Sequence, residues 1–154
     1  MNFSRREILK QSASLAIAAA GSSVLQAQAK LRSSELAAYD AVGLAELIRK
    51  KQITPLELVE DVLKRIERVN PKLNVVLTKN FDVEKARARA KQNLGDGKLA
   101  GVPVLLKNLV EYKDAKIDFG SRLYAAAIAK QGPLHKANSP FTAAMEKAGL
   151  IVTG

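Results

Sequence analysis

The segment Leu99-Ala100-Gly101-Val102-Pro103-Val104-Leu105-Leu106-Lys107-Asn108 decides the fold of this chain. Its residues 102–106 form an unbroken apolar run, which is typical of a β-strand covered on both faces. Lys107 follows directly, and ligand sites in open α/β sheets lie just beyond the carboxyl ends of strands. An ammonium held there loses hydration, which favours the neutral amine that a general base requires. Lys107 is therefore a candidate catalytic residue; the alternative is a lysine whose ammonium reaches water along its aliphatic stem.

Two helices are predicted before this strand. Apolar residues recur at helical spacing over residues 44–48, and the basic run 49–51 suits the negative end of a helix dipole. The next helix begins at Thr54-Pro55-Leu56-Glu57, which is a capping box with Pro at the first helical position. Its apolar stripe predicts an end at Asn70-Pro71. Together these helices are expected to form a helical hairpin.

A strand and a basic helix are predicted next. Residues 74–78 are rich in β-branched side chains and lie between Pro71 and Asn80, which predicts a strand. A helix is expected over residues 82–94, ending at Gly95-Asp96-Gly97. Its basic residues alternate with alanines, so the charge is spread around the helix. We interpret this as a solvated surface, with a nucleic-acid contact as the alternative. The basic residues are Lys85, Arg87, Arg89 and Lys91.

The last predicted elements complete an alternation of strands and helices. Ser139-Pro140-Phe141 begins a helix whose apolar stripe includes Met145 as a core residue, with Gly149 as its stop. Residues 150–153 read as a second buried strand. The alternation predicts an α/β fold with a parallel or mixed sheet covered by helices. With no later element to cover it, the last strand is expected to leave an apolar edge exposed.

The composition is that of a globular protein. The 154 residues include 25 Lys and Arg, 15 Asp and Glu, no Cys and 47% apolar residues, which excludes a disulfide scaffold and a disordered chain. The net charge of +10 favours an acidic partner only weakly. The single histidine, His135, has no Cys and no second His with which to complete a metal site. Gly95, Gly97 and Gly101 make no phosphate loop, because no Gly-Lys-Ser/Thr follows.

The N-terminus has the order of an export signal. The pair Arg5-Arg6 precedes a mild apolar stretch and the small-residue triplet Ala27-Gln28-Ala29. The apolar stretch is too short and too weak for a membrane anchor. We therefore predict a twin-arginine signal peptide at 1–29, a linker at 30–38, recognition by the twin-arginine export machinery, and a periplasmic or secreted protein. The alternative is an amphipathic helix with two incidental arginines.

Several segments together resemble the amidase signature family. The most specific is residues 99–107, which resembles the segment that supplies that family's catalytic lysine. Other segments resemble it as well: residues 54–58, 65–66 and 70–74 of the preceding helical region, Gly120-Ser121-Arg122, and residues 148–154. The resemblance covers residues 39–154 and is strongest to amidases of the 6-aminohexanoate-cyclic-dimer hydrolase type.

The resemblance implies hydrolysis of C–N bonds in linear or cyclic amides by a Ser-Ser-Lys acyl-enzyme mechanism, without metal or cofactor. Lys107 is the residue of this set that the resemblance places. Neither Ser121 nor Ser139 matches the positions of the two serines, which in the family lie further downstream. Residues 39–154 are therefore expected to be an incomplete amidase signature domain, inactive on its own.

The resemblance has two departures and leaves two alternatives open. Asn108 replaces the Asp that usually follows the lysine, and Lys136-Ala137-Asn138-Ser139 replaces an acidic stretch. One alternative function is that of the amidase-like subunit of a tRNA-dependent amidotransferase, against which the export signal argues. The other is a small basic module that binds an anionic partner. The leading interpretation predicts a small-molecule amide as partner and no nucleic acid; the particular amide and the oligomeric state stay open.

Overall fold

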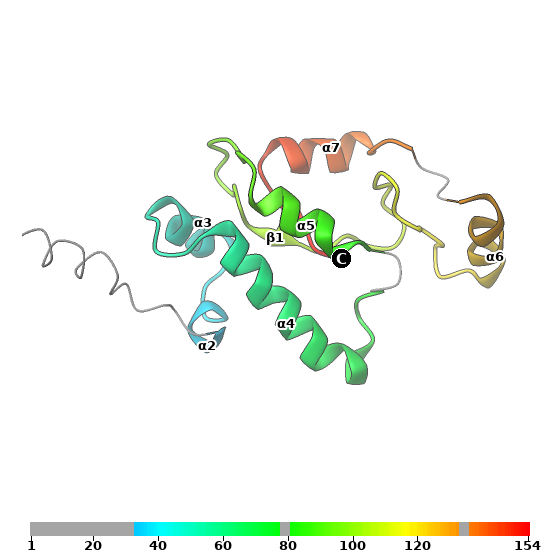
Figure 1. Cartoon of the computed structure of the whole chain (residues 1–154), viewed down its shortest axis with the longest axis horizontal. Coiled ribbons are helices and arrows are strands. Elements are labelled where there is room, and N and C mark those ends of the chain that lie inside the picture. The colour runs from blue at the N-terminus through cyan, green and yellow to red at the C-terminus, as the bar shows by residue number, and fades with distance from the viewer. Residues whose placement is uncertain (1–32, 78–80, 133–135) are drawn as a thin grey trace, which may run out of the picture. The chain divides into compact units, whose positions relative to one another are not determined.

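The computed structural model describes residues 33–77, 81–132 and 136–154 (Figure 1). Within these residues, helices precede the first strand of a two-stranded sheet and lie between its two strands, in the order α2 (Ser33–Leu36), α3 (Ala41–Arg49), α4 (Pro55–Leu73), α5 (Val83–Ala90), β1 (Pro103–Val104), α6 (Arg122–Gln131), α7 (Pro140–Lys147) and β2 (Ile151–Val152). Residues 1–29, the predicted signal, and His135 lie outside the described residues. Within the described ranges, no helix is long and apolar enough to cross a bilayer.

Local capping signals fix where the helices begin. The Asp40 carboxylate accepts the Gly43 N–H at the start of α3. Thr54 and Glu57 form the predicted capping box of α4, in which the Glu57 carboxylate accepts the Thr54 N–H at 3.0 Å. Ser139 caps α7 as expected. The N-terminal helical hairpin is therefore confirmed, and the segment 30–38, predicted as a linker, contains α2 with a buried Leu36.

The predicted end of α4 is wrong, because the helix continues through Pro71 to Leu73. Asn74 then closes it in the left-handed conformation and donates its N–H to the Asn70 carbonyl at 2.7 Å. The Asn70 carboxamide also donates to the Val76 carbonyl and accepts the Val76 N–H. These contacts hold the last turn although proline supplies no N–H to it.

The same contacts explain why residues 74–77, the described part of the predicted strand 74–78, do not form a strand. The Asn70 side chain takes both polar groups of the Val76 backbone, which a neighbouring strand would otherwise pair. Val76 is buried, whereas Val75 is 67% exposed. Residues 75–77 therefore form a loop held by a side chain rather than a strand held by a ladder.

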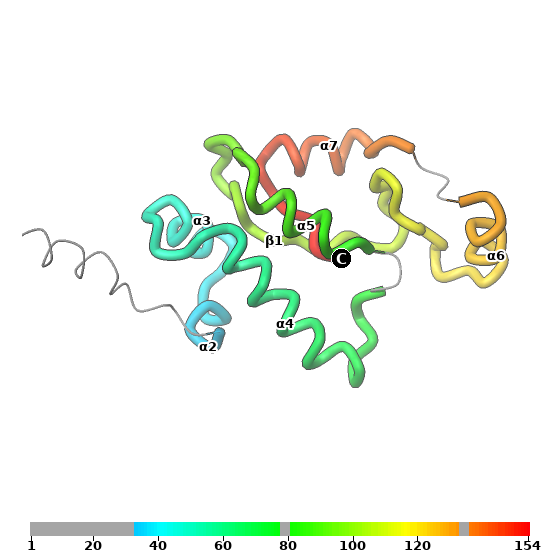
Figure 2. The backbone as a smooth tube through the Cα atoms, viewed as in Figure 1, coloured from blue at the N-terminus to red at the C-terminus, as the bar shows by residue number. Residues whose placement is uncertain are grey.

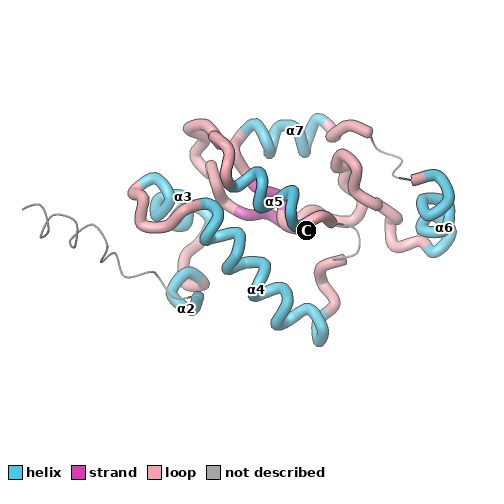
Figure 3. The backbone as a smooth tube through the Cα atoms, in the orientation of Figure 1, coloured by secondary structure: helices cyan, strands magenta, loops and turns pink. Residues whose placement is uncertain are grey.

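The sheet is parallel, which is one of the two arrangements predicted, and its regular part is short (Figure 3). Val102 and Val104 accept hydrogen bonds from Ile151 and Thr153 at 3.0 and 2.9 Å, and the Leu106 N–H donates to Gly154 at 2.8 Å. The expectation of cover on both faces is wrong for the run 102–106, since Pro103 and Val104 of β1 are only partly buried and Leu105 after them is 49% exposed. The sequence led us to expect an exposed apolar edge at the last strand; the apolar side chains of β2, Ile151 and Val152, are buried.

Two apolar clusters hold the fold together. In the first, Ile151 of β2 packs between α4 and α5 with Val59, Leu63, Ala86, Ala90 and Leu94. In the second, α2, α3 and the start of α4 meet through Leu36, Leu47, Ile53 and Leu58. Figures 1 and 2 show α4 and α5 beside the strands, in agreement with contacts between α5 and β2 and between α4 and β1. Helix α5 ends at Ala90, four residues earlier than predicted.

Helix α7 does not bury the stripe that the sequence predicted. Phe141 is 59% exposed and Met145 is only partly buried, so Met145 is not a core residue. The fully buried residue of α7 is Thr142, whose hydroxyl donates to the Glu111 carbonyl at 2.8 Å. The chain turns after α7 at Gly149, whose backbone has φ of 84° and lies against Leu94 and Ala100, so a side chain there would collide.

Candidate active site at the end of strand β1

Lys107 lies where the sequence places it, directly beyond the carboxyl end of the β1 ladder. Because the two strands are parallel, Gly154 at the end of β2 lies at the same edge of the sheet and accepts the Leu106 N–H. The Lys107 carbonyl accepts the N–H groups of Leu109 and Val110, so the chain turns sharply after the lysine. This edge is the position at which open α/β folds place their ligands.

A hollow of about 200 Å³ opens beside Lys107. Most of its wall is apolar, with Val76, Phe81, Leu105 and other aliphatic side chains, and Lys107 and Lys116 are the charged residues that line it. The expected loss of hydration at Lys107 is not seen, because the lysine is exposed in this structure. The hollow can receive an apolar group, but the ammonium beside it is in contact with water.

Asn108 closes the loop that follows the lysine. Its carboxamide donates to Asp118 Oδ1 at 2.5 Å and accepts the Asp118 N–H at 3.3 Å. Asp118 Oδ1 also accepts the Gly120 N–H at 2.9 Å. Asn108 stands where the resemblance leads one to expect Asp, and it still holds the local backbone through Asp118. The sequence did not indicate Asp118 as its partner.

The far side of this loop is fixed to α7 by Tyr112. The Tyr112 hydroxyl donates to Glu146 Oε1 at 3.1 Å, and Asn138 donates to the other oxygen at 2.6 Å. The Tyr112 ring stacks on Phe81 with centroids 6.3 Å apart, and Lys85 Nζ lies 4.1 Å from the ring centre. Burial, followed by the Glu146 charge, raises the pKa of Tyr112 well above its ordinary value of 10.0. Tyr112 is therefore a neutral anchor at physiological pH.

Ser121 and Ser139 serve as helix caps. Ser121 Oγ accepts the Tyr124 N–H at the start of α6, and Ser139 Oγ accepts the Thr142 N–H at the start of α7. Helix α6 was not predicted, although Ser121 before the Ala-rich stretch 122–131 and Gly132 after it were usable signals. Both hydroxyls therefore have a structural role at the start of a helix.

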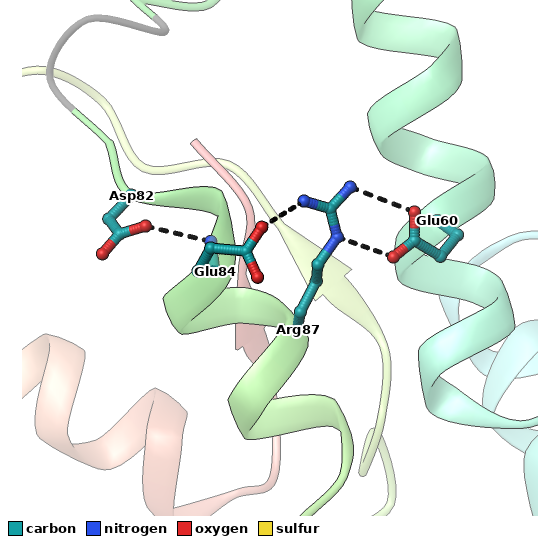
Figure 4. Close-up of polar contacts among 4 residues, drawn as sticks. All are labelled: Glu60, Asp82, Glu84 and Arg87. Carbon is teal, nitrogen blue, oxygen red and sulfur yellow. Dashed lines mark hydrogen bonds and ion pairs between the residues drawn. The ribbon is translucent and has the colours of Figure 1, made fainter.

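The basic residues of α5 make contacts within the chain rather than an open basic stripe. Arg87 binds Glu60 of α4 through Nε and Nη2 at 2.7 and 3.2 Å, and Glu84 through Nη1 at 2.6 Å (Figure 4). This bidentate hydrogen bonding lowers the pKa of Glu60. Lys85 donates to the Lys113 carbonyl, and Arg89 donates to the Glu146 carbonyl. These contacts favour the interpretation of α5 as a structural surface over a nucleic-acid contact.

The described residues offer no metal centre. No group of three or more His, Cys, Asp or Glu side chains able to hold a metal ion occurs within residues 33–77, 81–132 and 136–154. Gly101, which belongs to no phosphate loop, instead lets the chain pass closely by Ile48 and Pro55 with a positive φ. What the site offers chemically is an amine, a loop held by hydrogen bonds and an apolar hollow.

The chain is similar to known proteins of the amidase family. Residues 57–154 match the family model described as Amidase. The chain is 31% identical over 115 residues to 6-aminohexanoate-cyclic-dimer hydrolase of Pseudomonas sp. (strain NK87), which covers 75% of this chain and 22% of that protein. It is 36% identical over 84 residues to a subunit of the glutamyl-tRNA(Gln) amidotransferase of Geotalea daltonii (strain DSM 22248 / JCM 15807 / FRC-32), covering 52% of this chain and 17% of that protein.

A solved structure of 6-aminohexanoate cyclic dimer hydrolase, complexed with substrate, superposes with a TM-score of 0.64 at 30% identity. The match covers 75% of this chain and 23% of that one. The resemblance seen in the sequence, including its 6-aminohexanoate type, is thereby confirmed. The chain spans less than a quarter of the length of the relatives it matches.

Proposed function

The chain belongs to the amidase family, and from this premise we propose that it is the lysine-bearing N-terminal part of an exported amidase that hydrolyses linear or cyclic amides. The observation that carries the proposal is the position of Lys107. It follows β1 at the edge of the sheet where the ends of both strands meet, and it lines an apolar hollow. The amide hydrolases among the relatives support the reaction class.

In the proposed mechanism Lys107 is the general base of a Ser-Ser-Lys relay. The neutral lysine takes the proton of a bridging serine, which in turn takes the proton of the nucleophilic serine as its oxygen bonds to the amide carbonyl carbon. The C–N bond then breaks, the amine leaves with a proton, and water releases the acid from the acyl-enzyme. This relay uses the logic of a hydroxyl nucleophile activated by an adjacent base.

We further propose that residues 30–154 are inactive when isolated. Ser121 and Ser139 are used as helix caps, so the two serines of the relay have to come from the part of the family fold that these residues do not span. Lys107 is also exposed to water in this structure. Cover over the hollow by the serine-bearing part would remove that water.

The proposal is tested by measuring amine release from simple amides with purified residues 30–154, alone and with a complementing serine-bearing fragment. We expect no turnover alone. In the complemented sample we expect Lys107→Met to reduce turnover by about 100-fold or more. Lys116→Met is the matched control, because Lys116 lines the same hollow and has no role in the relay. Turnover by residues 30–154 alone, or full activity of the Lys107→Met complement, would contradict the proposal.

Export is proposed from the sequence of residues 1–29. Replacing Arg5 and Arg6 by Lys keeps the charge but removes the arginine pair, so we expect the protein to stay in the cytoplasm. Cell fractionation of the variant beside the unaltered chain measures this. Equal amounts of both proteins outside the inner membrane would refute the export route.

A role in a tRNA-dependent amidotransferase is the second candidate, because subunits of that enzyme are among the relatives. Retention of the unaltered chain in the cytoplasm would favour it over the exported amidase. The basic binding module is disfavoured by the contacts of Arg87 and Arg89 within the chain. Steeply salt-dependent binding to nucleic acid would support that module.

A further inference from the structure

The loop that begins at Lys107 is closed at its base by one pair of side chains. Asn108, the residue after the lysine, and Asp118 are joined by two hydrogen bonds, one in each direction. A third bond, from the Gly120 N–H to Asp118 Oδ1, ties the chain that leaves the loop to the same carboxylate. Both side chains are partly buried. These bonds of Asn108 therefore hold the backbone next to Lys107 in place.

We propose that Asn108 is a positioning residue for Lys107, acting through this pair. The inference rests on the proposed function only in giving Lys107 its role. The Lys107 carbonyl already accepts the N–H groups of Leu109 and Val110, and the bonds of Asn108 set the direction in which this tight turn leaves the sheet edge. The side chain of Lys107 starts from the peptide so fixed, beside the hollow.

The chemistry of the pair explains why residue 108 is an amide in this chain. A carboxamide can donate to a carboxylate and accept from a backbone N–H at the same time, which is what Asn108 does toward Asp118. An ionised Asp at 108 would have no donor for Asp118 and would place two carboxylates in contact. Asn108 is therefore matched to Asp118, and the departure from the family pattern is compensated rather than a loss.

The far part of the loop is anchored separately. The Glu111 carbonyl accepts from Ser139 and Thr142, and the Lys113 N–H donates to Asn138. These bonds to the start of α7 do not involve Asn108. Loss of the Asn108–Asp118 pair should therefore open the base of the loop and leave the Lys113 end in place.

The test compares the full chain with Asn108→Asp, Asp118→Asn and the exchanged double variant. Asp118→Asn and the exchange both retain a donor and an acceptor, whereas Asn108→Asp alone opposes two carboxylates. Amide hydrogen exchange at residues 118 and 120 reports on the base of the loop, and residue 113 is the internal reference. Competitive acylation of the Lys107 amine, relative to that of Lys147 on α7, reports on the lysine.

We expect Asn108→Asp to speed exchange at residues 118 and 120 about tenfold, with residue 113 unchanged. Lys107 acylation should change about threefold or more, because the peptide from which its side chain starts is no longer held by the pair. Asp118→Asn and the exchanged variant should return both readouts to within about twofold of the original chain. Unchanged exchange at Val59 and Leu63 of the core identifies variants that have kept their fold.

Three results would overturn the proposal. One is an Asn108→Asp chain that exchanges like the original, and another is an exchanged variant that stays as open as Asn108→Asp. The third is an opened loop with unaltered Lys107 acylation, which would show that the pair does not position the lysine. None of these readouts depends on amide turnover, so a failure of the proposed function in the complemented assay is a separate result.

Discussion

Replacement of Ile151 tests whether β2 is the buried centre of the fold. Ile151 is fully buried and packs on Val59 and Leu63 of α4 and on Leu94 after α5. Ile151→Ala removes three carbon atoms, which at about 0.8 kcal/mol each is roughly 2.4 kcal/mol of transfer free energy. The cavity left behind brings the expected loss in free energy of unfolding to about 3 to 4 kcal/mol. Ile151→Val removes one carbon and should cost about 1 kcal/mol.

Urea unfolding followed by circular dichroism measures these losses, provided that the slope with urea is the same in all variants. Leu123→Ala on α6 is the matched control, because Leu123 is 80% exposed and its truncation should change the free energy by less than about 0.5 kcal/mol. Should Ile151→Ala abolish the cooperative transition, Ile151→Val still gives the size of the effect. An Ile151→Ala chain as stable as the Leu123→Ala chain would refute this packing.

Three further perturbations follow from individual contacts. Tyr112→Phe should lessen the loss of stability at alkaline pH. The pKa of Tyr112 is raised in the folded chain, so the stability that its protonated hydroxyl contributes is lost as pH rises above the ordinary value of 10.0. Urea titrations at pH 8 to 11 measure this. Arg87→Gln should lessen the loss of stability at acid pH. Arg87 lowers the pKa of Glu60 in the folded chain, so the ion pair contributes stability above the ordinary value of 4.5, and this stability is lost as pH falls through the pKa of the folded chain. Thermal unfolding between pH 7 and pH 3 measures it. Thr142→Val should cost about 1 kcal/mol in urea unfolding, since it deletes a buried hydroxyl that donates to a carbonyl.

Each of these has a control or a contrary result. Tyr124→Phe removes a hydroxyl from an exposed tyrosine, so an equal alkaline effect there would remove the case for Tyr112. An acid transition identical in the original chain and Arg87→Gln would show that Glu60 gains nothing from its partner. A Thr142→Ser chain keeps the hydroxyl, and a larger loss in Thr142→Ser than in Thr142→Val would show that the methyl group, not the hydrogen bond, matters.

The sequence predicted the features that depend on neighbouring residues. The capping box at Thr54 and the cap at Ser139 are signals within a few positions, and both have the expected structure. The apolar run before Lys107 contains the expected strand, although that strand is short and is not covered on both faces. The strand at 74–78 failed because the Asn70 carboxamide satisfies the Val76 backbone, which an alternation pattern does not reveal. The hydrogen bonds of the Asn70 side chain therefore outweigh the strand propensity of this segment.

The candidate site divides in the same way. Lys107 could be placed because a strand end and a family resemblance both point to it. The contacts that hold the loop after Lys107 could not be predicted. They join Asn108 to Asp118 across 10 positions and Tyr112 to Glu146 across 34 positions, and tertiary folding brings these residues together. The exposure of Lys107 was also beyond prediction, since hydration depends on what packs over a side chain rather than on the residues that precede it.

The parallel pairing of β1 with β2 has a consequence for the folding route. It joins Pro103 to Ile151 across the whole of α6 and α7, whereas α4 and α5 are near neighbours along the chain. Closing the longer loop costs more chain entropy, and that cost comes before the strand contacts reward it. We therefore expect the α4–α5 pair to nucleate folding and β2 to dock late. The edge that carries Lys107 would then be among the last parts of the molecule to take shape.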